Sequence, residues 1–169
     1  YEIIVVDKMT YAANRDFLKV IKKTPKIRFV KKDINYLKTL YGCKIIYNFA
    51  AESHVDNSIK SSDEFIKSNI NGVNNLLKLA NKERVDLFVQ ISTDEVYGDK
   101  LRGESKETDA LRPSSPYSAS KAAAEMLCMS ASRTYDFPVL ITRSCNNFGI
   151  GQHKEKLIPH SIQTLLERK

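Results

Sequence analysis

The sequence predicts an α/β fold with a Rossmann-like, doubly wound parallel sheet. Short apolar segments alternate with helical patterns along the chain, and this order is typical of a parallel sheet covered by helices on both faces. The segment Ile3-Ile4-Val5-Val6 is apolar without interruption, as expected for a strand buried on both faces. Because 169 residues with 42% hydrophobic side chains can form one core, we expect residues 1–169 to be a single domain.

Five apolar segments bounded by polar or turn residues predict the strands. These segments are 3–6, 27–30, 44–49, 87–91 and 138–142. The two long helical patterns between them are 62–81 and 114–134. Shorter helices are predicted at 14–21, 35–41 and 155–167.

The usual start of a dinucleotide-binding sheet is missing from this order. Such a sheet begins with a strand, a glycine-rich turn and a helix, and an acidic ribose ligand follows about twenty residues after the glycines. The first glycine here is Gly42, whereas Asp7 already stands directly after the first apolar segment, where that acid is expected. We therefore expect a partial dinucleotide-binding domain that lacks the first strand and the glycine-rich turn. The C-terminal substrate domain is also expected to be absent.

The net charge of +7 is compatible with an anionic partner such as nucleic acid, with a phosphorylated substrate or with a lysine-rich surface. Apolar residues interrupt the densest basic segment, 19–32, and no nucleic-acid-binding motif or series of stacking aromatics accompanies it. We therefore favour a lysine-rich surface and expect no nucleic-acid partner.

The cysteines indicate a reducing compartment. Cys43, Cys128 and Cys145 are odd in number, far apart and without a C-x-x-C spacing, so neither a disulfide framework nor a zinc site is predicted. All three lie in or beside apolar patterns and are expected to be buried. No apolar segment is long enough to cross a bilayer, and the first residues are not a signal peptide. We expect a cytoplasmic protein with no bound metal and no membrane partner.

Two polar motifs carry the candidate chemistry. Tyr117 and Lys121 are four residues apart, so a helix places them on one face, where a lysine ammonium favours the phenolate form of a tyrosine. Such a tyrosine can take a proton from an alcohol. Thr93, Asp94 and Glu95 follow a predicted strand, which places a hydroxyl and two carboxylates at the mouth of a cleft. One phenolic base beside two acids suggests oxidation coupled to elimination.

Each candidate also has a simpler interpretation. A Tyr-x-x-x-Lys spacing is expected about once by chance in this composition, so it gains weight only from its place after 113–116 and the strand-end acids. Asp7 could be an ordinary strand-end acid, and Asp94 with Glu95 could form a solvated turn. His54 is expected to be structural or to orient substrate, because no other histidine stands at a metal-ligand spacing from it.

Taken together, these motifs resemble the extended short-chain dehydrogenases/reductases, and specifically the nucleoside-diphosphate-glucose 4,6-dehydratases. The matching stretches keep one consistent order along almost the whole chain, at 7–12, 32–34, 48–56, 92–98, 113–121, 146–149 and 155–159. The Asp94-Glu95 pair is the most specific, because epimerases and decarboxylases of the superfamily usually lack it. The resemblance implies a lyase that converts an NDP-glucose, with dTDP-glucose the expected substrate, into the NDP-4-keto-6-deoxyglucose in deoxysugar biosynthesis.

The resemblance also implies a mechanism with NAD as a recycled cofactor. Tyr117, as phenolate, would take the proton of the sugar O4 while hydride leaves C4, and Thr93 would hydrogen-bond O4. Glu95 would then remove the C5 proton as general base. Asp94, protonated, would give a proton to the departing C6 hydroxyl. Lys121 would lower the pKa of Tyr117 and bind the nicotinamide ribose.

Further residues match the binding positions of the family. Those expected to contact the cofactor, besides Tyr117 and Lys121, are Asp7, Lys8, Thr10, Asp33, Ile34, Phe49, Ala50, Ala51, Ser68, Ser92 and Asn146. Asp7 would accept hydrogen bonds from the adenosine ribose and repel a 2′-phosphate, which favours NAD over NADP. Those expected to contact the nucleotide-sugar substrate are Ser53, His54, Asn147, Glu155, Lys156 and Leu157.

Two other classes of function stay open at this point. The first is another extended-family enzyme, an epimerase or a decarboxylase. The second is an inactive remnant with a partner-binding or regulatory role, which would explain the missing glycine-rich turn. The resemblance also implies a homodimer in which the two long helices pack against their mates. We expect this segment alone to be inactive, because the turn that holds the pyrophosphate is absent.

Overall fold

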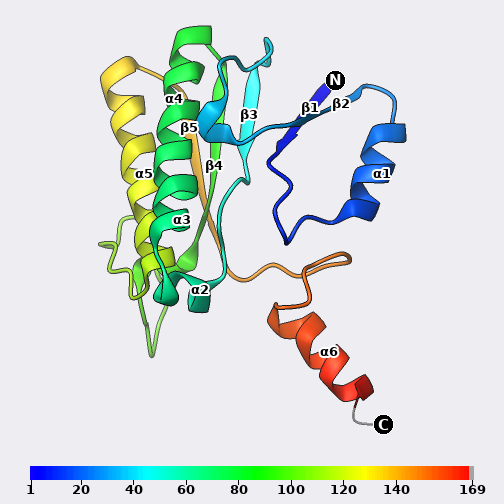
Figure 1. Ribbon diagram of the computed structural model, residues 1–169. Coiled ribbons are helices and arrows are strands. Elements are labelled where there is room, and N and C mark those ends of the chain that lie inside the picture. Colours follow the sequence, from blue (N-terminus) through cyan, green and yellow to red (C-terminus); the bar gives the residue numbers. More distant parts are fainter. Residues whose placement is uncertain (168–169) are drawn as a thin grey trace. The chain divides into compact units, whose positions relative to one another are not determined.

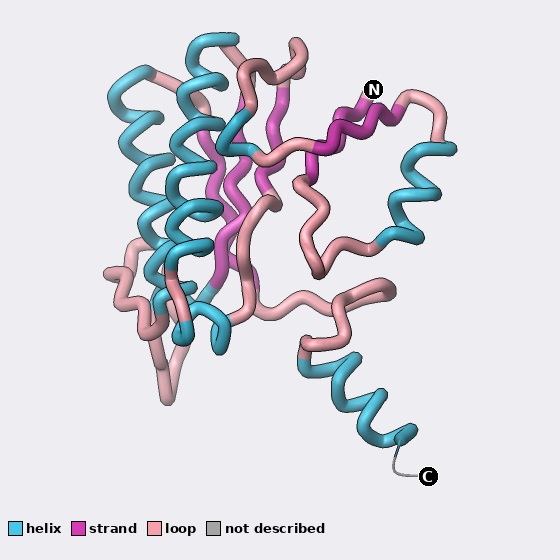
Figure 2. The backbone as a smooth tube through the Cα atoms, viewed as in Figure 1, coloured by secondary structure: helices cyan, strands magenta, loops and turns pink. Residues whose placement is uncertain are grey.

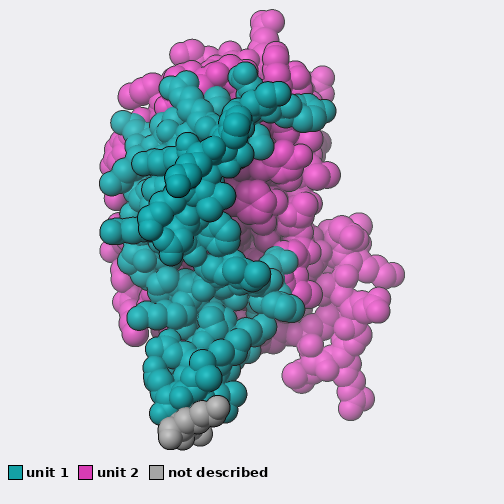
Figure 3. Space-filling view, turned by 90° about the vertical axis from the view of Figure 1, so that its right-hand side faces the viewer, with its two compact units in different colours: residues 1–32, 146–169 teal, residues 33–145 magenta. Residues whose placement is uncertain are grey.

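The structure, a computed structural model, describes residues 1–167 and separates the chain into two compact units. The smaller unit combines Tyr1–Lys32 with Asn146–Lys169, and the larger unit is Asp33–Cys145 (Figure 3). Each unit contains its own parallel sheet. The strands expected in one sheet therefore form two hydrogen-bonded groups.

The smaller unit contains a two-stranded parallel sheet. β1 (Ile3–Asp7) pairs along its whole length with β2 (Ile27–Lys31). α1 (Arg15–Lys23) connects the two strands. Asn14 caps α1, because its side chain accepts hydrogen bonds from two N–H groups of the first turn. α6 (Leu157–Glu167) belongs to the same unit.

The larger unit contains a three-stranded parallel sheet in the order β3-β4-β5 (Figure 1). β3 (Ile45–Asn48) and β5 (Val139–Ser144) flank β4 (Leu87–Thr93). Gln90 of the central strand is fully buried, and its side-chain oxygen accepts a hydrogen bond from the Asn48 amide at 2.9 Å. The buried position of β4 allows it to deliver the residues at its carboxyl end to a fixed place.

Two long helices, α4 and α5, lie side by side on one face of this sheet (Figures 1 and 2). The helices of the unit are α2 (Val55–Lys60), α3 (Asp63–Phe65), α4 (Gly72–Glu83) and α5 (Pro116–Tyr135). Apolar side chains between helices and sheet form the core, among them Val73, Leu76, Leu77, Ala80, Phe88, Val89, Ala124 and Cys128. Small residues at Ala80 and Ala124 are completely buried and permit close packing of the helices.

A six-residue π-helical segment, Ile66–Asn71, lies between α3 and α4. The periodicity of 62–81 predicted an uninterrupted α-helix and contained no signal for a π-helical segment. Asn69 lies in this segment and is buried. Its side chain binds the N–H of Glu52 at 2.8 Å, the carbonyl of Glu52 at 3.0 Å and the hydroxyl of Ser120 at 2.8 Å. These tertiary bonds accompany the local widening of the helix and connect it to α5.

The five predicted strands and four of the five predicted helices are confirmed, with ends that differ by no more than two residues. The helix predicted at 35–41 is wrong: only a short 3₁₀ turn, Ile34–Tyr36, forms there. Leu37 and Leu40 are buried, as their apolar pattern indicated, but the backbone at Leu37 is extended.

Distant side chains explain why the helix at 35–41 does not continue. The N–H of Leu40 donates to the carboxylate of Glu83 at 2.9 Å. The amide of Asn75 donates to the carbonyls of Ile34 and Leu37 at 2.7 and 3.2 Å. Backbone groups that a helix would pair internally are thus bound by α4.

The expected burial of the cysteines holds for one of the three. Cys128 is buried as expected, but Cys145 is exposed, because it directly follows the end of β5, and Cys43 is only partly buried. Within residues 1–167, no helix has the length and apolar character needed to cross a membrane. The same residues contain no cluster of three or more side chains that could hold a metal ion.

Candidate active site

β4 ends in the polar residues of the candidate site. Thr93 is its last residue and is buried, and the 3₁₀ turn η3 (Asp94–Tyr97) follows directly. The Thr93 hydroxyl accepts a hydrogen bond from the N–H of Glu95 at 3.2 Å and donates one to the Asp94 carboxylate at 3.3 Å. Thr93 therefore caps the turn that carries both acids. Asp94 and Glu95 are half-buried, unlike the acids of a fully solvated turn.

Tyr117 lies in the first turn of α5, which begins at a well-defined cap. Ser115 and Ser118 form a capping box, in which each hydroxyl accepts a hydrogen bond from the backbone N–H of the other residue at 3.0 Å. The N–H of Tyr117 donates to the hydroxyl of Ser58 in α2 at 3.1 Å. The Tyr117 ring meets Phe65 edge-on, with the ring centres 6.4 Å apart. These contacts hold the phenol in a defined position.

The surroundings raise the pKa of Tyr117 to about 12. Burial is the main cause, and the negative charges of Glu95 and, more weakly, Asp94 raise the pKa further. A hydrogen bond with Thr93 acts in the opposite direction. The structure therefore brings Tyr117 together with all three residues of the strand-end motif within one unit.

The Lys121 ammonium is directed at the backbone of β4. It donates a hydrogen bond to the carbonyl of Ile91 at 2.6 Å, and the residue is only 5% exposed. Burial lowers the pKa of Lys121 to about 8, while the negative charge of Glu125, one turn further along α5, acts against this lowering. The expected lowering of the Tyr117 pKa by Lys121 is not seen, because the ammonium is bound to Ile91 and burial dominates at the phenol.

Replacing Lys121 with methionine is expected to stabilise the fold. The pKa of Lys121 is about 8 in the folded protein against an ordinary 10.5, so burial of its charge opposes folding below pH 8. This opposition disappears as the pH rises from about 8 to about 10.5. Methionine removes the charge and also the bond to Ile91, so we expect a net gain of ~2 kcal/mol in the free energy of unfolding at pH 7.

Urea unfolding of the full-length Lys121→Met variant at pH 7 and pH 10 measures this effect. The gain over the wild type should shrink at pH 10, because the wild-type lysine is then largely neutral in the folded state. A variant less stable than the wild type at both pH values would contradict the prediction.

Sequence reasoning missed two residues, Glu125 and Arg143. Glu125 is completely buried in α5, and its carboxylate lies 2.7 Å from the guanidinium of Arg143 in β5. The available signals were a glutamate on the same alanine-rich helix face as Lys121 and an arginine inside an apolar strand.

Ser92 lies beside Thr93 at the end of β4, and its side-chain oxygen is buried. Within residues 1–167 this oxygen has no hydrogen-bond partner. Buried hydroxyl groups are normally paired, so a bound polar group would satisfy it. Phe49, Ala50 and Ala51 follow the neighbouring strand β3, and the Phe49 side chain is exposed. These residues fit a polar ligand at this end of the sheet.

Three other predicted cofactor residues have structural contacts in the larger unit. Asp33 caps the 3₁₀ turn Ile34–Tyr36 by accepting a hydrogen bond from the N–H of Asn35 at 2.8 Å. The Ile34 side chain is buried over Gly72, where a Cβ atom would lie only 2.5 Å from the Ile34 Cδ1. Ser68 is buried in the π-helical segment. Their contacts with a cofactor stay predictions.

The predicted substrate residues of the larger unit lie at the start of α2. His54 is the residue before this helix, and Ser53 is exposed. The Nδ1 atom of His54 is buried and has no hydrogen-bond partner in the described part of the chain. His54 is thus a second buried polar group that a ligand could satisfy.

The smaller unit holds the other predicted cofactor residues. Asp7 is exposed at the end of β1, and its carboxylate accepts a hydrogen bond from the N–H of Met9 at 2.5 Å. Lys8 and Thr10 belong to the same turn, and Asn146 is an exposed residue at the start of the second segment of this unit. Asp7 is therefore accessible to solvent, and its contact with a cofactor stays a prediction.

The predicted substrate residues of the smaller unit lie around the start of α6. The Glu155 carboxylate accepts a hydrogen bond from the Tyr11 hydroxyl at 3.3 Å, so the segments around these two residues lie side by side. Asn147 is exposed, and its carbonyl accepts a hydrogen bond from the Gln152 amide at 3.1 Å. The two remaining members are Lys156, directly before α6, and Leu157, its exposed first residue.

The fold and the site define a Rossmann-like α/β protein with a Ser-Thr strand end beside a Tyr-x-x-x-Lys helix. A family model described as the NAD dependent epimerase/dehydratase family matches residues 1–169. The chain belongs to this family.

Individual proteins of known sequence or structure are also similar to this chain. The low-salt glycan biosynthesis protein Agl12 of Haloferax volcanii is 47% identical over 165 residues, which cover 95% of this chain and 53% of Agl12. The solved structure of a DesIV double mutant, a dTDP-glucose 4,6-dehydratase from Streptomyces venezuelae with NAD bound, is 42% identical with a TM-score of 0.94. That match covers 99% of this chain and 53% of DesIV.

An epimerase structure is similar as well. UDP-glucuronic acid 4-epimerase from Bacillus cereus, solved with UDP-glucuronic acid and NAD, is 25% identical with a TM-score of 0.93, over 100% of this chain and 56% of the epimerase. The chain thus spans about half the length of each of these three proteins.

Proposed function

We propose that this chain carries the catalytic residues of an NAD-dependent nucleotide-sugar 4,6-dehydratase, with dTDP-glucose as the substrate. The observation that carries the proposal is geometric: Thr93 is hydrogen-bonded to the Tyr117 phenol and also caps the turn that carries both acids. Elimination of water needs an acid and a base next to the group that initiates oxidation. The similarity to the S. venezuelae dTDP-glucose 4,6-dehydratase supports the same function.

Tyr117 is the proposed base for the first proton. As phenolate it takes the proton of the sugar O4, and Thr93, its hydrogen-bond partner, holds the same oxygen. NAD, when bound, would supply the acceptor for the hydride that leaves C4 and the donor of the hydride that C6 gains. Because the Tyr117 pKa is about 12 in these surroundings, the phenolate needs a nearby positive charge. Lys121, on the same face of α5, would supply one after its ammonium leaves the carbonyl of Ile91.

Asp94 and Glu95 are the proposed groups for the elimination step. The ketone at C4 acidifies the C5 hydrogen, which Glu95 removes as general base. Asp94, protonated, gives a proton to the C6 hydroxyl, so that water leaves. Two neighbouring carboxyl groups rarely ionise together, and their pKa values separate into those of an acid and a base. Thr93 bonds the Asp94 carboxylate and the backbone N–H of Glu95, so it holds the turn that carries both acids.

Each unit offers polar residues that we propose as contacts of NAD. Ser92 offers a buried hydroxyl without a protein partner among residues 1–167, and Lys121 has donors beyond its one bond to Ile91. Asp7 offers an exposed carboxylate to the adenosine ribose and would repel a 2′-phosphate. We therefore expect NAD to be preferred over NADP.

Replacing Glu95 with glutamine tests the elimination step. Glutamine keeps the size of the side chain but cannot accept the C5 proton, so water release should fall by about 10³-fold. Oxidation at C4 should persist, so reduced cofactor should accumulate in a single turnover of the full-length protein with dTDP-glucose. Absorbance of the reduced nicotinamide and mass spectrometry of the sugar measure the two steps. Normal water release by this variant would show that the role assigned to Glu95 is wrong.

A 4-epimerase is the second candidate, because the B. cereus epimerase shares the fold over the whole chain. Product analysis separates the two functions. Only the dehydratase forms a 4-keto-6-deoxy sugar, whereas an epimerase returns a sugar of unchanged mass. A product of unchanged mass with every nucleotide-glucose tested would favour the epimerase.

We also propose a homodimer that packs α4 and α5 against their mates. Met126 and Met129 support it, because these apolar side chains are exposed on the surface of α5. A monomer of the full-length protein in light scattering would contradict this arrangement.

A further inference from the structure

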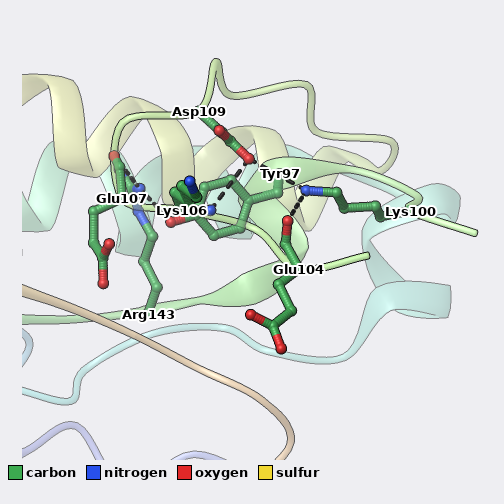
Figure 4. Close-up of polar contacts among 7 residues, drawn as sticks. All are labelled: Tyr97, Lys100, Glu104, Lys106, Glu107, Asp109 and Arg143. Atoms are coloured by element: carbon green, nitrogen blue, oxygen red, sulfur yellow. Dashed lines mark hydrogen bonds and ion pairs between the residues drawn. The ribbon is translucent and has the colours of Figure 1, made fainter. Parts of the chain in front are cut away.

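Arg143 connects three segments of the larger unit. Its guanidinium binds the Glu125 carboxylate of α5 through Nε at 3.0 Å and Nη2 at 2.7 Å. Its Nη1 donates to the Tyr97 hydroxyl of η3 at 2.7 Å and to the carbonyl of Glu107 at 3.1 Å. Figure 4 shows Arg143 reaching toward Tyr97 and Glu107. The Tyr97 ring also covers the guanidinium, with its centre 4.8 Å from Cζ.

Two of these segments carry the proposed catalytic groups. Glu125 lies four residues after Lys121 and eight after Tyr117, so all three occur along one side of α5. Tyr97 lies two residues after Glu95, at the end of the turn that begins with Asp94. Arg143 therefore joins the helix of the phenol to the turn of the two acids.

The turn η3 needs such support because it is only four residues long. Other bonds to this turn include the one from the N–H of Glu95 to Thr93 and the one from the N–H of Arg112 to the carbonyl of Val96 at 2.9 Å. The guanidinium is a planar group with donors in fixed directions, so it sets orientation as well as distance. Glu125 is completely buried and in turn fixes Arg143.

We propose that Tyr97 and Arg143 are positioning residues that hold the carboxylates of Asp94 and Glu95 at a set distance from Tyr117. This inference rests on the proposed dehydratase function. It predicts a selective defect: loosening the turn should slow elimination, which uses Asp94 and Glu95, more than oxidation, which uses Tyr117.

The full-length Tyr97→Phe variant tests the proposal with little disturbance of the fold. Phenylalanine keeps the ring over the guanidinium and removes only the hydroxyl that Arg143 binds. We expect water elimination to fall about tenfold while KM for the nucleotide-sugar stays unchanged, because small displacements of catalytic groups are costly to the rate. Reduced cofactor should accumulate in a single turnover. Arg143→Lys, which keeps the charge and loses the planar fork, should show a larger defect of the same kind.

Lys100→Met is the matched control in the loop that follows η3. Lys100 binds the Glu104 carbonyl and the Asp109 carboxylate, and neither contact involves Arg143 (Figure 4). This variant should keep the wild-type ratio of elimination to oxidation. A wild-type ratio of elimination to oxidation in the Tyr97→Phe variant would overturn the proposal.

A second measurement does not depend on the reaction. Glu95 and Asp94 raise the pKa of Tyr117, burial raises it as well, and the Thr93 hydrogen bond lowers it. If Tyr97→Phe lets the acids move away, NMR titration of labelled Tyr117 should show its pKa falling from about 12 toward 10. A shifted titration in a protein that eliminates no water would support positioning and reject the dehydratase function. An unshifted titration would overturn positioning, whatever the activity of the wild type.

Discussion

Full-length Tyr117→Phe is expected to lose about 10³-fold in kcat with a nucleotide-glucose, because the variant has no base for the O4 proton. Phenylalanine preserves the ring, and with it the edge-on contact to Phe65 and the backbone bond to Ser58. The fold and KM should therefore change little. The loss should appear in the first step, so no reduced cofactor accumulates in a single turnover. This pattern is the opposite of that expected for Glu95→Gln.

Tyr135→Phe is the control for this substitution. Tyr135 is the exposed last residue of the same helix, far along α5 from Tyr117, and its hydroxyl has no role in the proposed mechanism. Stopped-flow absorbance and steady-state kinetics on both variants separate a local chemical loss from a general effect of removing a phenol. Near-normal oxidation by Tyr117→Phe would mean that another group takes the O4 proton.

Glu125→Gln is expected to produce the largest change in stability, a loss of about 3 kcal/mol in the free energy of unfolding, because it leaves a largely buried guanidinium without its counter-charge. Glu125 is completely buried and the Arg143 side chain is 11% exposed, so water has little access to the place of the lost carboxylate. Urea unfolding of the full-length protein at pH 7 measures the loss.

Two further variants serve as comparisons for the stability of Glu125→Gln. Lys67→Gln breaks an exposed pair with Glu64, in which the charged atoms are 3.6 Å apart, and should change stability by less than ~1 kcal/mol. The double variant Glu125→Leu with Arg143→Met removes both charges and should recover much of the loss of Glu125→Gln, since apolar side chains can fill a buried pair's place. A Glu125→Gln variant as stable as Lys67→Gln would show that the buried pair contributes little.

Local patterns were sufficient for most elements of the fold. The strands and the helices around them follow from runs of β-branched residues and from apolar spacings of three and four, and their ends follow from caps such as Asn14 and Ser115. The parallel pairing of the strands is confirmed in both sheets. These features depend on neighbouring residues, which a sequence displays directly.

The candidate site was predictable where its residues are close in sequence. Thr93, Asp94 and Glu95 are consecutive, and Tyr117 and Lys121 share a helix face, so a motif of a few residues contains each group. The direction of the Tyr117 pKa was not predictable in this way. It depends on burial and on Glu95, which comes from a different element, and the Lys121 ammonium is bound to Ile91 instead.

The α/β class, the strand-end acids and the Tyr-Lys pair could be predicted from the amino-acid order, because they are properties of adjacent residues and of helix and strand periods. Three other features required the folded arrangement of the chain: the loss of the helix at 35–41, the π-helical segment around Asn69, and the junction of Glu125, Arg143 and Tyr97. All three have the same cause. Hydrogen-bond partners from distant parts of the chain satisfy backbone or charged groups, and no local pattern records which partners they are.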